Sequence, residues 1–395
     1  MNFSKTINRL INGLYMLEIS KSIKKLDDID IGDNIFHYDY NVNHLLSLIA
    51  SGIDKEDTLY LSSYRSFEGE VFENFIYEKL LRYAQENDNI DKFILKGFHQ
   101  RRQKAHANTL SISEKQQIVY RTKSREISEF DAMFITKDKE LYFVEMTLVK
   151  SVLKLRKRLR KKKALLETIF PDYEIKALII LNEGATGTRQ FPDYCTVWFT
   201  KEFTAKDVLE YIQNPDSREL SKISRVCSTK MIEAHSLKLY QFRYYNTMSW
   251  ITKTLRSHKK FALDMNFLYK DTVQRYHDLY NKFYIGYIDI AEAKELLDLQ
   301  GEYQEDQRVI VAIEKKYSDE IVLTYYVQRN RKNLYLYSFS DAGKVIKEKK
   351  DPYGITVTEV FHINKMMDDS YKLNLPNLKK IKQLLKTRFE VDSKK

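Results

Sequence analysis

Two acidic residues in the middle of apolar segments are the first candidates for chemistry. Asp131 lies in residues 129–134 (EFDAMF), and Glu145 lies in residues 142–147 (YFVEMT). Because side chains alternate along a strand, a hairpin formed by these two segments would bring the carboxylates side by side. Buried carboxylates are costly without a partner, and a hard cation such as Mg²⁺ suits oxygen ligands. The pair therefore predicts a divalent-metal site; the alternative is a solvated acidic face of a sheet.

The apolar pattern around this pair predicts the elements that must position it. Between residues 67 and 200, apolar residues recur with a helical period in some segments and alternate with polar residues in others. They also form a continuous run, which is typical of a buried strand. The tight polar turn at 137–139 indicates a hairpin. In chain order we expect a helix over 68–84, strands over 92–98, 127–136 and 141–148, a helix over 151–170, and a buried strand over 174–181.

With these residues and this order of elements, segment 67–200 resembles the core of the PD-(D/E)XK nuclease superfamily, the restriction-endonuclease-like fold. That core is a helix, a three-strand meander, a helix and a further strand. The resemblance implies that Asp131, Glu145 and the backbone carbonyl of Met146 hold Mg²⁺ or Mn²⁺. It also implies that Glu73, in the helix pattern GEVFE, holds a second metal ion or orients water.

One position departs from the family pattern. The family has a lysine two residues after the strand glutamate, and this chain has Thr147 there. Threonine cannot supply a positive charge. In some branches of the superfamily the basic group lies on the following helix, which makes Lys150 and Lys154 the candidates here. The alternative is an inactive site.

The segment after Glu145 is strongly basic. Nine of the fourteen residues 150–163 are Lys or Arg and none is acidic. Like charges four residues apart destabilise a helix, so this density favours a phosphate-binding face over a purely structural one. A second basic stretch, residues 98–125, predicts either a substrate-gripping flap or a disordered loop. The residues predicted to contact nucleic acid are Arg101, Arg102, Lys104, Arg156, Lys157, Arg160 and Lys161.

Composition and charge are compatible with this interpretation. The chain has 395 residues, 66 Lys and Arg against 55 Asp and Glu, and a formal charge of +11. Basic proteins often bind phosphate backbones, although codon bias in an A/T-rich genome would also enrich lysine. Two cysteines indicate a reducing compartment, and the lack of a long apolar run predicts no transmembrane helix. We therefore expect a cytoplasmic protein with a nucleic-acid partner and no membrane partner.

The chain is long enough for more than one domain. We expect an α/β fold with an N-terminal helical segment (1–66), a nuclease-like domain (67–220) and an additional C-terminal α+β domain (240–395). Within the last, residues 228–300 look mainly helical and residues 307–363 look like a strand meander. The predicted function is metal-dependent hydrolysis of nucleic acid, DNA in preference to RNA. The alternatives are an inactive nucleic-acid-binding protein on a nuclease scaffold, and a nuclease effector regulated by its C-terminal domain. The sequence leaves homo-oligomerisation open.

Overall fold

The computed structural model describes residues 29–100, 107–122, 125–200, 203–240, 242–255, 264–280, 282–297, 304–305, 307–316, 320–330, 333–339, 345–350 and 371–392. The chain divides into two compact units, Met1–Phe242 and Arg243–Lys395. Sequence analysis predicts a boundary between residues 220 and 240, and the division falls just after that range. Within the described residues, no helix is both long and apolar enough to cross a membrane.

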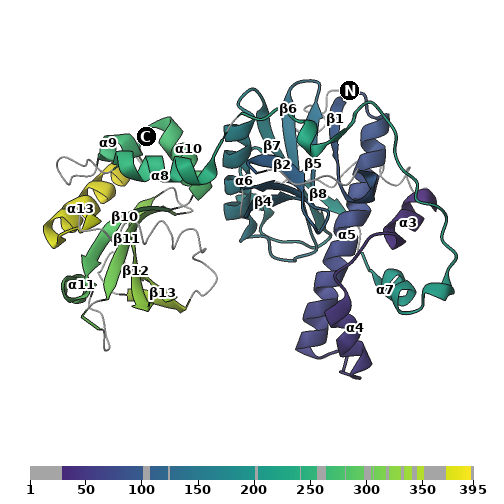
Figure 1. Cartoon of the computed structure of the whole chain (residues 1–395), viewed down its shortest axis with the longest axis horizontal. Coiled ribbons are helices and arrows are strands. Elements are labelled where there is room, and N and C mark those ends of the chain that lie inside the picture. Colours follow the sequence, from purple (N-terminus) through teal and green to yellow (C-terminus); the bar gives the residue numbers. More distant parts are fainter. Residues whose placement is uncertain are drawn as a thin grey trace. The chain divides into compact units, whose positions relative to one another are not determined.

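The first unit is built on a six-stranded mixed sheet (Figure 1). Its strand order is β8-β7-β6-β5-β1-β9. The pairs β6–β7, β7–β8 and β1–β9 are parallel, and the pairs β1–β5 and β5–β6 are antiparallel. The chain is therefore of the mixed α/β class, as predicted. The strands are β1 (Ile90–Leu95), β5 (Ala132–Thr136), β6 (Glu140–Thr147), β7 (Glu174–Asn182), β8 (Cys195–Thr200) and β9 (Met231–Glu233).

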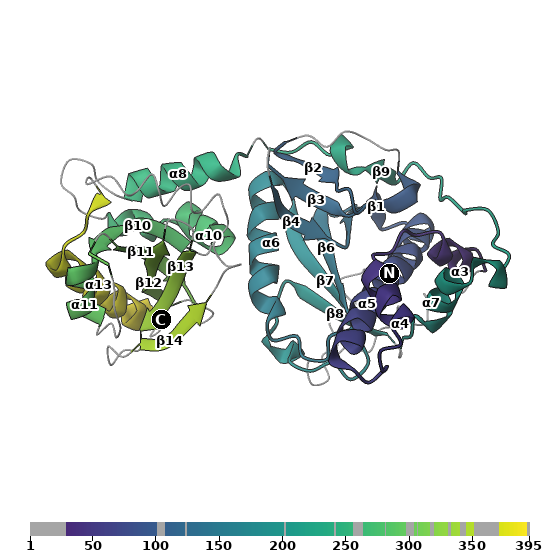
Figure 2. The same cartoon turned by 60° about the horizontal axis from the view of Figure 1, so that its bottom comes forward.

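Two helices, α5 (Thr58–Glu86) and α6 (Leu155–Ile169), cover opposite faces of this sheet (Figure 2). On the α5 face, Phe72 and Ile76 of the helix pack with Val144 and Met146 of β6 in one buried cluster. On the far side of α5, Phe67 and Val71 pack in a second buried cluster with three short helices. These helices are α3 (Ile29–Phe36), α4 (Asn43–Ala50) and α7 (Lys206–Gln213). Helix α5 is thus held on both sides.

A small antiparallel sheet interrupts the predicted meander. It has the order β2-β3-β4 and consists of β2 (Thr109–Ile112), β3 (Ile118–Arg121) and β4 (Glu126–Phe130). The described part of the basic stretch 98–125 is therefore folded, and the expectation of a disordered loop is wrong there. The single strand predicted over 127–136 is divided at Asp131, with β4 pairing to β3 and β5 pairing to β1 and β6.

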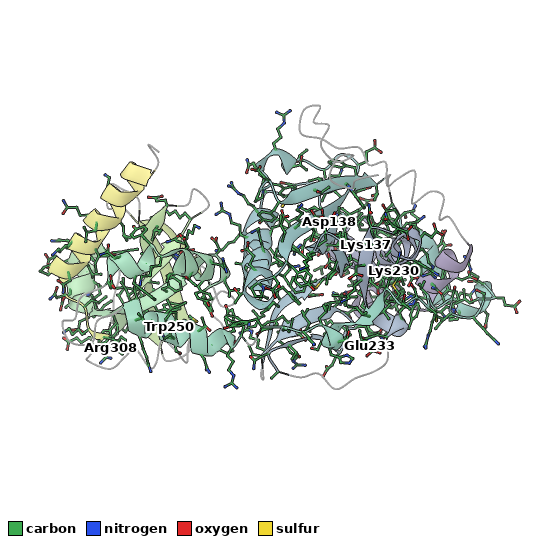
Figure 3. The ribbon with its side chains drawn as sticks, turned by 90° about the horizontal axis from the view of Figure 1, so that it is seen from above. Lys137, Asp138, Lys230, Glu233, Trp250 and Arg308 are labelled. Carbon is green, nitrogen blue, oxygen red and sulfur yellow. The ribbon has the colours of Figure 1, made fainter. Side chains whose placement is uncertain are left out.

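Other element boundaries also differ from the sequence-based expectation. Helix α5 begins at Thr58, ten residues before the predicted start, because the Asp57 side chain accepts a hydrogen bond from the Leu59 N–H and caps it there. Helix α6 begins at Leu155, so Lys150 and Lys154 lie before the first helical residue. The predicted hairpin turn is present, with Lys137 and Asp138 at its tip (Figure 3). Sequence analysis did not predict β9.

The second unit contains a five-stranded antiparallel sheet in the order β10-β11-β12-β13-β14. Helices predominate among the described residues of 228–300, as predicted, but strand β10 lies among them and was not predicted. The predicted strand at 355–363 lies outside the described residues. The strands are β10 (Lys282–Asp289), β11 (Arg308–Lys315), β12 (Ile321–Asn330), β13 (Asn333–Phe339) and β14 (Val345–Lys350). The helices are α8 (Tyr244–Leu255), α9 (Met265–Leu268), α10 (Asp271–Tyr280), α11 (Ile290–Leu297) and α13 (Leu375–Asp392).

A buried carboxylate fixes the position of α5 in the first unit. Glu78 is completely buried and accepts hydrogen bonds from four groups: Tyr38 Oη (2.6 Å), His99 Nε2 (2.6 Å), Arg82 Nη1 (2.7 Å) and Asn34 Nδ2 (3.0 Å). Burial alone would disfavour its charge, but these donors hold the pKa of Glu78 below its ordinary value. The helix is therefore tied to α3 and to the segment after β1.

Gly97 permits the close packing around this carboxylate. Its φ is +63°, and a Cβ atom there would lie 2.9 Å from Cε1 of Tyr38. A left-handed conformation of this kind favours glycine. The turn at Gly97 lets the chain direct His99 towards Glu78 immediately after Lys96.

We expect Glu78→Ala to reduce the free energy of unfolding of the first unit by about 3–5 kcal/mol, because Arg82 would keep a buried charge without its partner. Trp198 belongs to the first unit and Trp250 to the second, and the chain has no other tryptophan. Urea unfolding followed by Trp198 fluorescence in a Trp250→Phe background therefore reports on the first unit. Glu86→Ala, an exposed change in the same helix, is the control and should alter stability by less than about 0.5 kcal/mol. Equal effects of the two substitutions would contradict the assigned role of Glu78.

Candidate functional site

The site forms where β4 and β5 meet at Asp131. Ala132 pairs with Val144 in the main sheet, whereas Phe130 pairs with Ile118 in the small sheet. Between them, the buried carboxylate of Asp131 accepts a hydrogen bond of 2.6 Å from the Met146 backbone N–H. We call this place, defined by Asp131 and Met146, the fork. In a continuous β-ladder a backbone carbonyl would accept the hydrogen bond of the Met146 N–H; here the Asp131 side chain accepts it.

Glu145 lies beside the fork on the face of the sheet covered by α6. Its side chain is fully buried, with one oxygen bonded to Lys162 Nζ. Its other oxygen, Oε2, lies 2.6 Å from Nη2 of Arg158. From the residues that the structure describes, no hydrogen bond of suitable geometry reaches Oε2, so the Arg158 contact is an ion pair only. The Arg158 side chain is 55% exposed, whereas that of Lys162 is 7% exposed.

Lys162 is the residue that sequence reasoning missed. It is buried in α6, and its ammonium lies 5.3 Å from the centre of the Phe130 ring. Burial lowers the pKa of Lys162, and the negative charges of Asp131, Glu129 and Glu73 oppose that shift. A signal was present in the sequence, because Lys162 takes the one polar position in the helical stripe of Leu155, Leu159, Leu166 and Ile169.

A second buried lysine, Lys96, approaches the fork from the end of β1. Its ammonium donates a hydrogen bond of 3.0 Å to Oε1 of Gln117 and lies 4.9 Å from the centre of the Tyr77 ring. Burial lowers the pKa of Lys96, while Glu73 and Asp131 oppose the shift. The sequence gives only a weak signal for this residue, a lysine that ends an apolar strand.

Glu73 reaches the same group of charges from α5. It is partly buried, and burial together with the charge of Asp131 raises the pKa of Glu73 to about 8. The positive charges of Lys96 and Lys162 counteract part of this rise. The three predicted acids, Glu73, Asp131 and Glu145, therefore meet around one buried set of charges, although Glu73 and Glu145 approach from opposite faces of the sheet.

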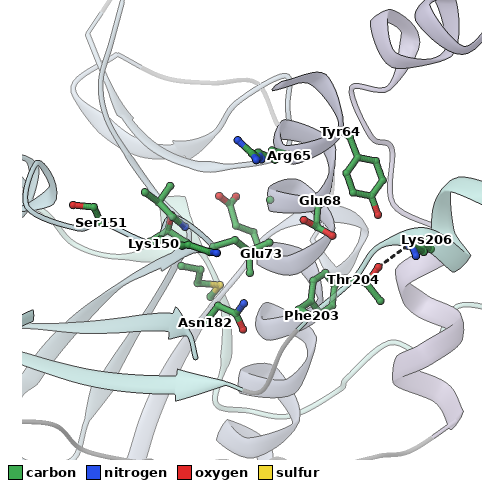
Figure 4. A pocket seen from close by; sticks show the side chains of 15 residues that line it. Tyr64, Arg65, Glu68, Glu73, Lys150, Ser151, Asn182, Phe203, Thr204 and Lys206 are labelled. Atoms are coloured by element: carbon green, nitrogen blue, oxygen red, sulfur yellow. Dashed lines mark hydrogen bonds between the residues drawn. The ribbon is translucent and has the colours of Figure 1, made fainter. Parts of the chain in front are cut away.

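The predicted basic residues are distributed differently. Lys150 lies in the connection between β6 and α6, and its side chain points towards Glu73 (Figure 4). Lys154 is exposed and precedes the first residue of α6, so the structure does not bring it to the fork. Four predicted contacts lie on α6 and are partly exposed: Arg156, Lys157, Arg160 and Lys161. Three others lie outside the described residues: Arg101, Arg102 and Lys104.

A pocket of about 990 Å³ opens next to the fork on the α5 side (Figure 4). Glu73, Met146 and Thr147 line it, so the pocket reaches the end of β6 and the residue that replaces the family lysine. Its rim carries three exposed cations, Arg65, Lys150 and Lys206.

The carboxylates do not form a ready metal cage. Across the part of the chain that the structure describes, no group of three or more His, Cys, Asp or Glu side chains is arranged to hold a metal ion. The chemistry of the donors nevertheless suits Mg²⁺ or Mn²⁺, because carboxylate oxygens predominate. Among the described residues, the buried Oε2 of Glu145 has no hydrogen-bond partner, and the cation beside it is the half-exposed Arg158. The residues therefore fit a divalent cation that takes the place of the Arg158 guanidinium.

In comparisons with protein-family models, with curated proteins and with solved structures, nothing matches this chain.

The raised pKa of Glu73 predicts a pH-dependent stability. A carboxyl whose pKa is higher in the folded than in the unfolded state stabilises the fold below its unfolded value, here near 4.5, and this contribution is lost as the pH rises through about 8. In EDTA, Glu73→Gln should therefore be more stable than the parent at pH 8, and the difference should shrink towards pH 5. The slope cannot exceed about 1.4 kcal/mol per pH unit for one proton.

Urea midpoints of Trp198 fluorescence at several pH values between 5 and 8 measure this difference. Glu86→Gln, an exposed change in the same helix, should leave the pH profile of the parent unaltered. Parallel pH profiles for Glu73→Gln and the parent would show that Glu73 titrates normally.

Proposed function

We propose that this protein is a metal-dependent nuclease of the PD-(D/E)XK type that hydrolyses phosphodiester bonds, in DNA rather than RNA. The observation that carries the proposal is the convergence of Glu73, Asp131 and Glu145 on one buried charge cluster at an interruption of the sheet. Buried carboxylates are retained at such cost mainly where they do chemistry or hold a cation.

The order of elements in the first unit also supports the proposal. Helix α5 precedes an antiparallel meander of β1, β5 and β6, which is followed by helix α6 and strand β7. This is the order of helix, three strands, helix and strand in the restriction-endonuclease-like core. The small sheet β2–β4 would then be an insertion between the first two strands of that core.

We assign the metal to Asp131 and Glu145, with Glu73 as a further ligand or as the group that orients water. When bound, a divalent cation would lower the pKa of a water molecule and neutralise charge on the phosphate. The chain's own residues prepare this place. Asp131 is held by the Met146 N–H, Glu145 is held by Lys162, and Arg158 can leave for solvent and pair with a phosphate.

Lys162 is the best candidate to replace the positive charge that Thr147 does not supply. Lys162 lies on the helix after the glutamate strand, is buried, and bonds directly to Glu145. It would hold the carboxylate in one orientation and keep a positive charge close to the reacting phosphate. This assignment replaces Lys154, and it leaves Lys150 as a phosphate contact at the pocket.

The rival function is nucleic-acid binding on an inactive scaffold. The ion pairs of Glu145 with two cations favour it, because they compensate the charge of this carboxylate without metal. Incubation of the protein with plasmid, single-stranded DNA and RNA, in Mg²⁺, Mn²⁺ or EDTA, distinguishes the two functions.

If the proposal is right, Asp131→Asn and Glu145→Gln should each reduce divalent-dependent cleavage to background, because an amide binds a divalent cation far more weakly than a carboxylate. Glu140→Gln is the matched control on the same strand, since Glu140 pairs with Lys176 away from the fork. It should cleave at the parental rate. Cleavage at the parental rate by Asp131→Asn or Glu145→Gln, with folding confirmed by Trp198 fluorescence, would contradict the assignment of this metal site.

For Lys162→Met we expect a loss of about 10²–10³ in cleavage rate, the typical cost of one positioned transition-state charge. Lys163→Met is the control, because Lys163 pairs with Glu167 on the neighbouring face of α6. A role in chemistry rather than folding predicts that Thr147→Lys, which restores the family pattern, recovers part of the rate in the Lys162→Met background. Nucleic-acid binding in EDTA should change little. An unaltered cleavage rate in Lys162→Met would exclude this role.

A further inference from the structure

The pocket beside the fork has the composition of a binding site for an unpaired nucleotide. Its volume of about 990 Å³ lies at the upper end of the range for small-molecule sites, roughly 300–1,000 Å³. Met146 belongs to both the pocket and the fork, and Glu73 lines the pocket and interacts with the charge of Asp131, so anything bound in the pocket lies next to the candidate reacting centre.

Three cations surround the pocket, and each comes from a different element. Arg65 projects from α5, Lys150 from the connection after β6, and Lys206 from the first residue of α7 (Figure 4). All three are exposed. Two acids, Glu68 and Glu73, also line the pocket, so the lining carries three cations against two carboxyls. The rim is therefore suited to phosphate groups.

Two aromatic side chains form part of the wall. Tyr64 stacks on Tyr60 with ring centres 6.2 Å apart, and Phe203 packs against Phe72 and Phe75 at 5.3 and 5.5 Å. Their neighbours hold both rings in place before a ligand arrives. Val149, which is 58% exposed, adds an apolar side chain at the same wall. Fixed rings beside cations are the features by which proteins bind single strands.

We propose that this pocket holds unpaired nucleotides of a single-stranded segment and presents the adjoining phosphodiester to the fork. The proposal rests on the proposed nuclease function and narrows its substrate to strands with free ends, gaps or overhangs. A base pair inside a duplex cannot use the rings, because its bases already stack on their neighbours. A free nucleotide shares the same chemistry, but a pocket that adjoins the metal site suits a strand that continues into it.

Fluorescence anisotropy in EDTA tests this with the full-length protein and three labelled DNAs: a short single strand, a blunt duplex and a duplex with a single-stranded overhang. We expect the single strand and the overhang to bind at least tenfold more tightly than the blunt duplex. Arg65→Ala/Lys206→Ala should remove this preference and reduce the logarithmic salt slope for the single strand by about 1.4, or about 0.7 for each phosphate contact.

Controls separate the pocket from general charge and from folding. Lys137→Ala/Lys222→Ala removes the same charge from exposed positions outside the pocket and should leave the preference intact. Tyr64→Leu and Phe203→Leu should each weaken single-strand binding about tenfold. Tyr240→Leu, at a ring that is 66% exposed and outside the pocket, should not. Because Arg65 and Lys206 are exposed, their variant tests the proposal even if an aromatic variant fails to fold.

Equal affinity for single strand and blunt duplex would overturn the proposal, as would parental binding by the Arg65/Lys206 variant. The proposal would also be overturned if adenosine monophosphate displaced the labelled single strand at a concentration equal to that of the strand. The pocket would then be a free-nucleotide site. These outcomes are separate from hydrolysis. A protein that prefers single strands but cleaves nothing with Mg²⁺ or Mn²⁺ would support the single-strand pocket and contradict the nuclease function. Cleavage of blunt duplex as fast as single strand would support the nuclease function and contradict the single-strand pocket.

Discussion

The hydrogen bond between the Asp131 carboxylate and the Met146 N–H determines how the first unit is organised. In a continuous ladder that N–H would be paired with a backbone carbonyl, and a buried N–H without a partner is costly. Because a side chain supplies the acceptor, β4 is able to leave the main sheet and join β3. The interruption therefore leaves this N–H paired, and it places a carboxylate within the sheet itself, where it interacts with charges on both faces.

The neighbouring charges follow from that placement. Glu73 comes from α5 on one face, Lys162 comes from α6 on the other, and both interact with the charge of Asp131. Desolvation acts against every one of these charged groups, and mutual pairing offsets it. The balance is incomplete, since Glu73 holds its proton up to about pH 8 and Glu145 relies on an exposed arginine. The charges of the cluster are therefore only partly compensated by one another.

The sequence was enough to predict the supports and the acids of this site but not its buried lysines. The spacing of apolar residues within single segments predicts three of these supports: strand β7, the β5–β6 hairpin and the apolar face of α5. Lys162 was not predicted because its segment contains eight other basic residues. It differs from them only in its position within the apolar stripe of α6. Lys96 and the small sheet depend on contacts between segments distant in the chain, which no local period encodes.

Helix α6 has a buried side that compensates the charge of Glu145 and another side that carries four cations. Its buried side must neutralise Glu145, and its exposed side carries Arg156, Lys157, Arg160 and Lys161. A helix with so many like charges is weakened by repulsion along its own surface, so packing of Leu159, Leu165 and Leu166 against the sheet has to hold it in place. Lys162 is buried within that packing, where its ion pair with Glu145 offsets part of the cost of burying its charge. The position of the basic helix therefore depends in part on the ion pair between Lys162 and the strand carboxylate, which lies on the opposite side of α6 from the four partly exposed cations.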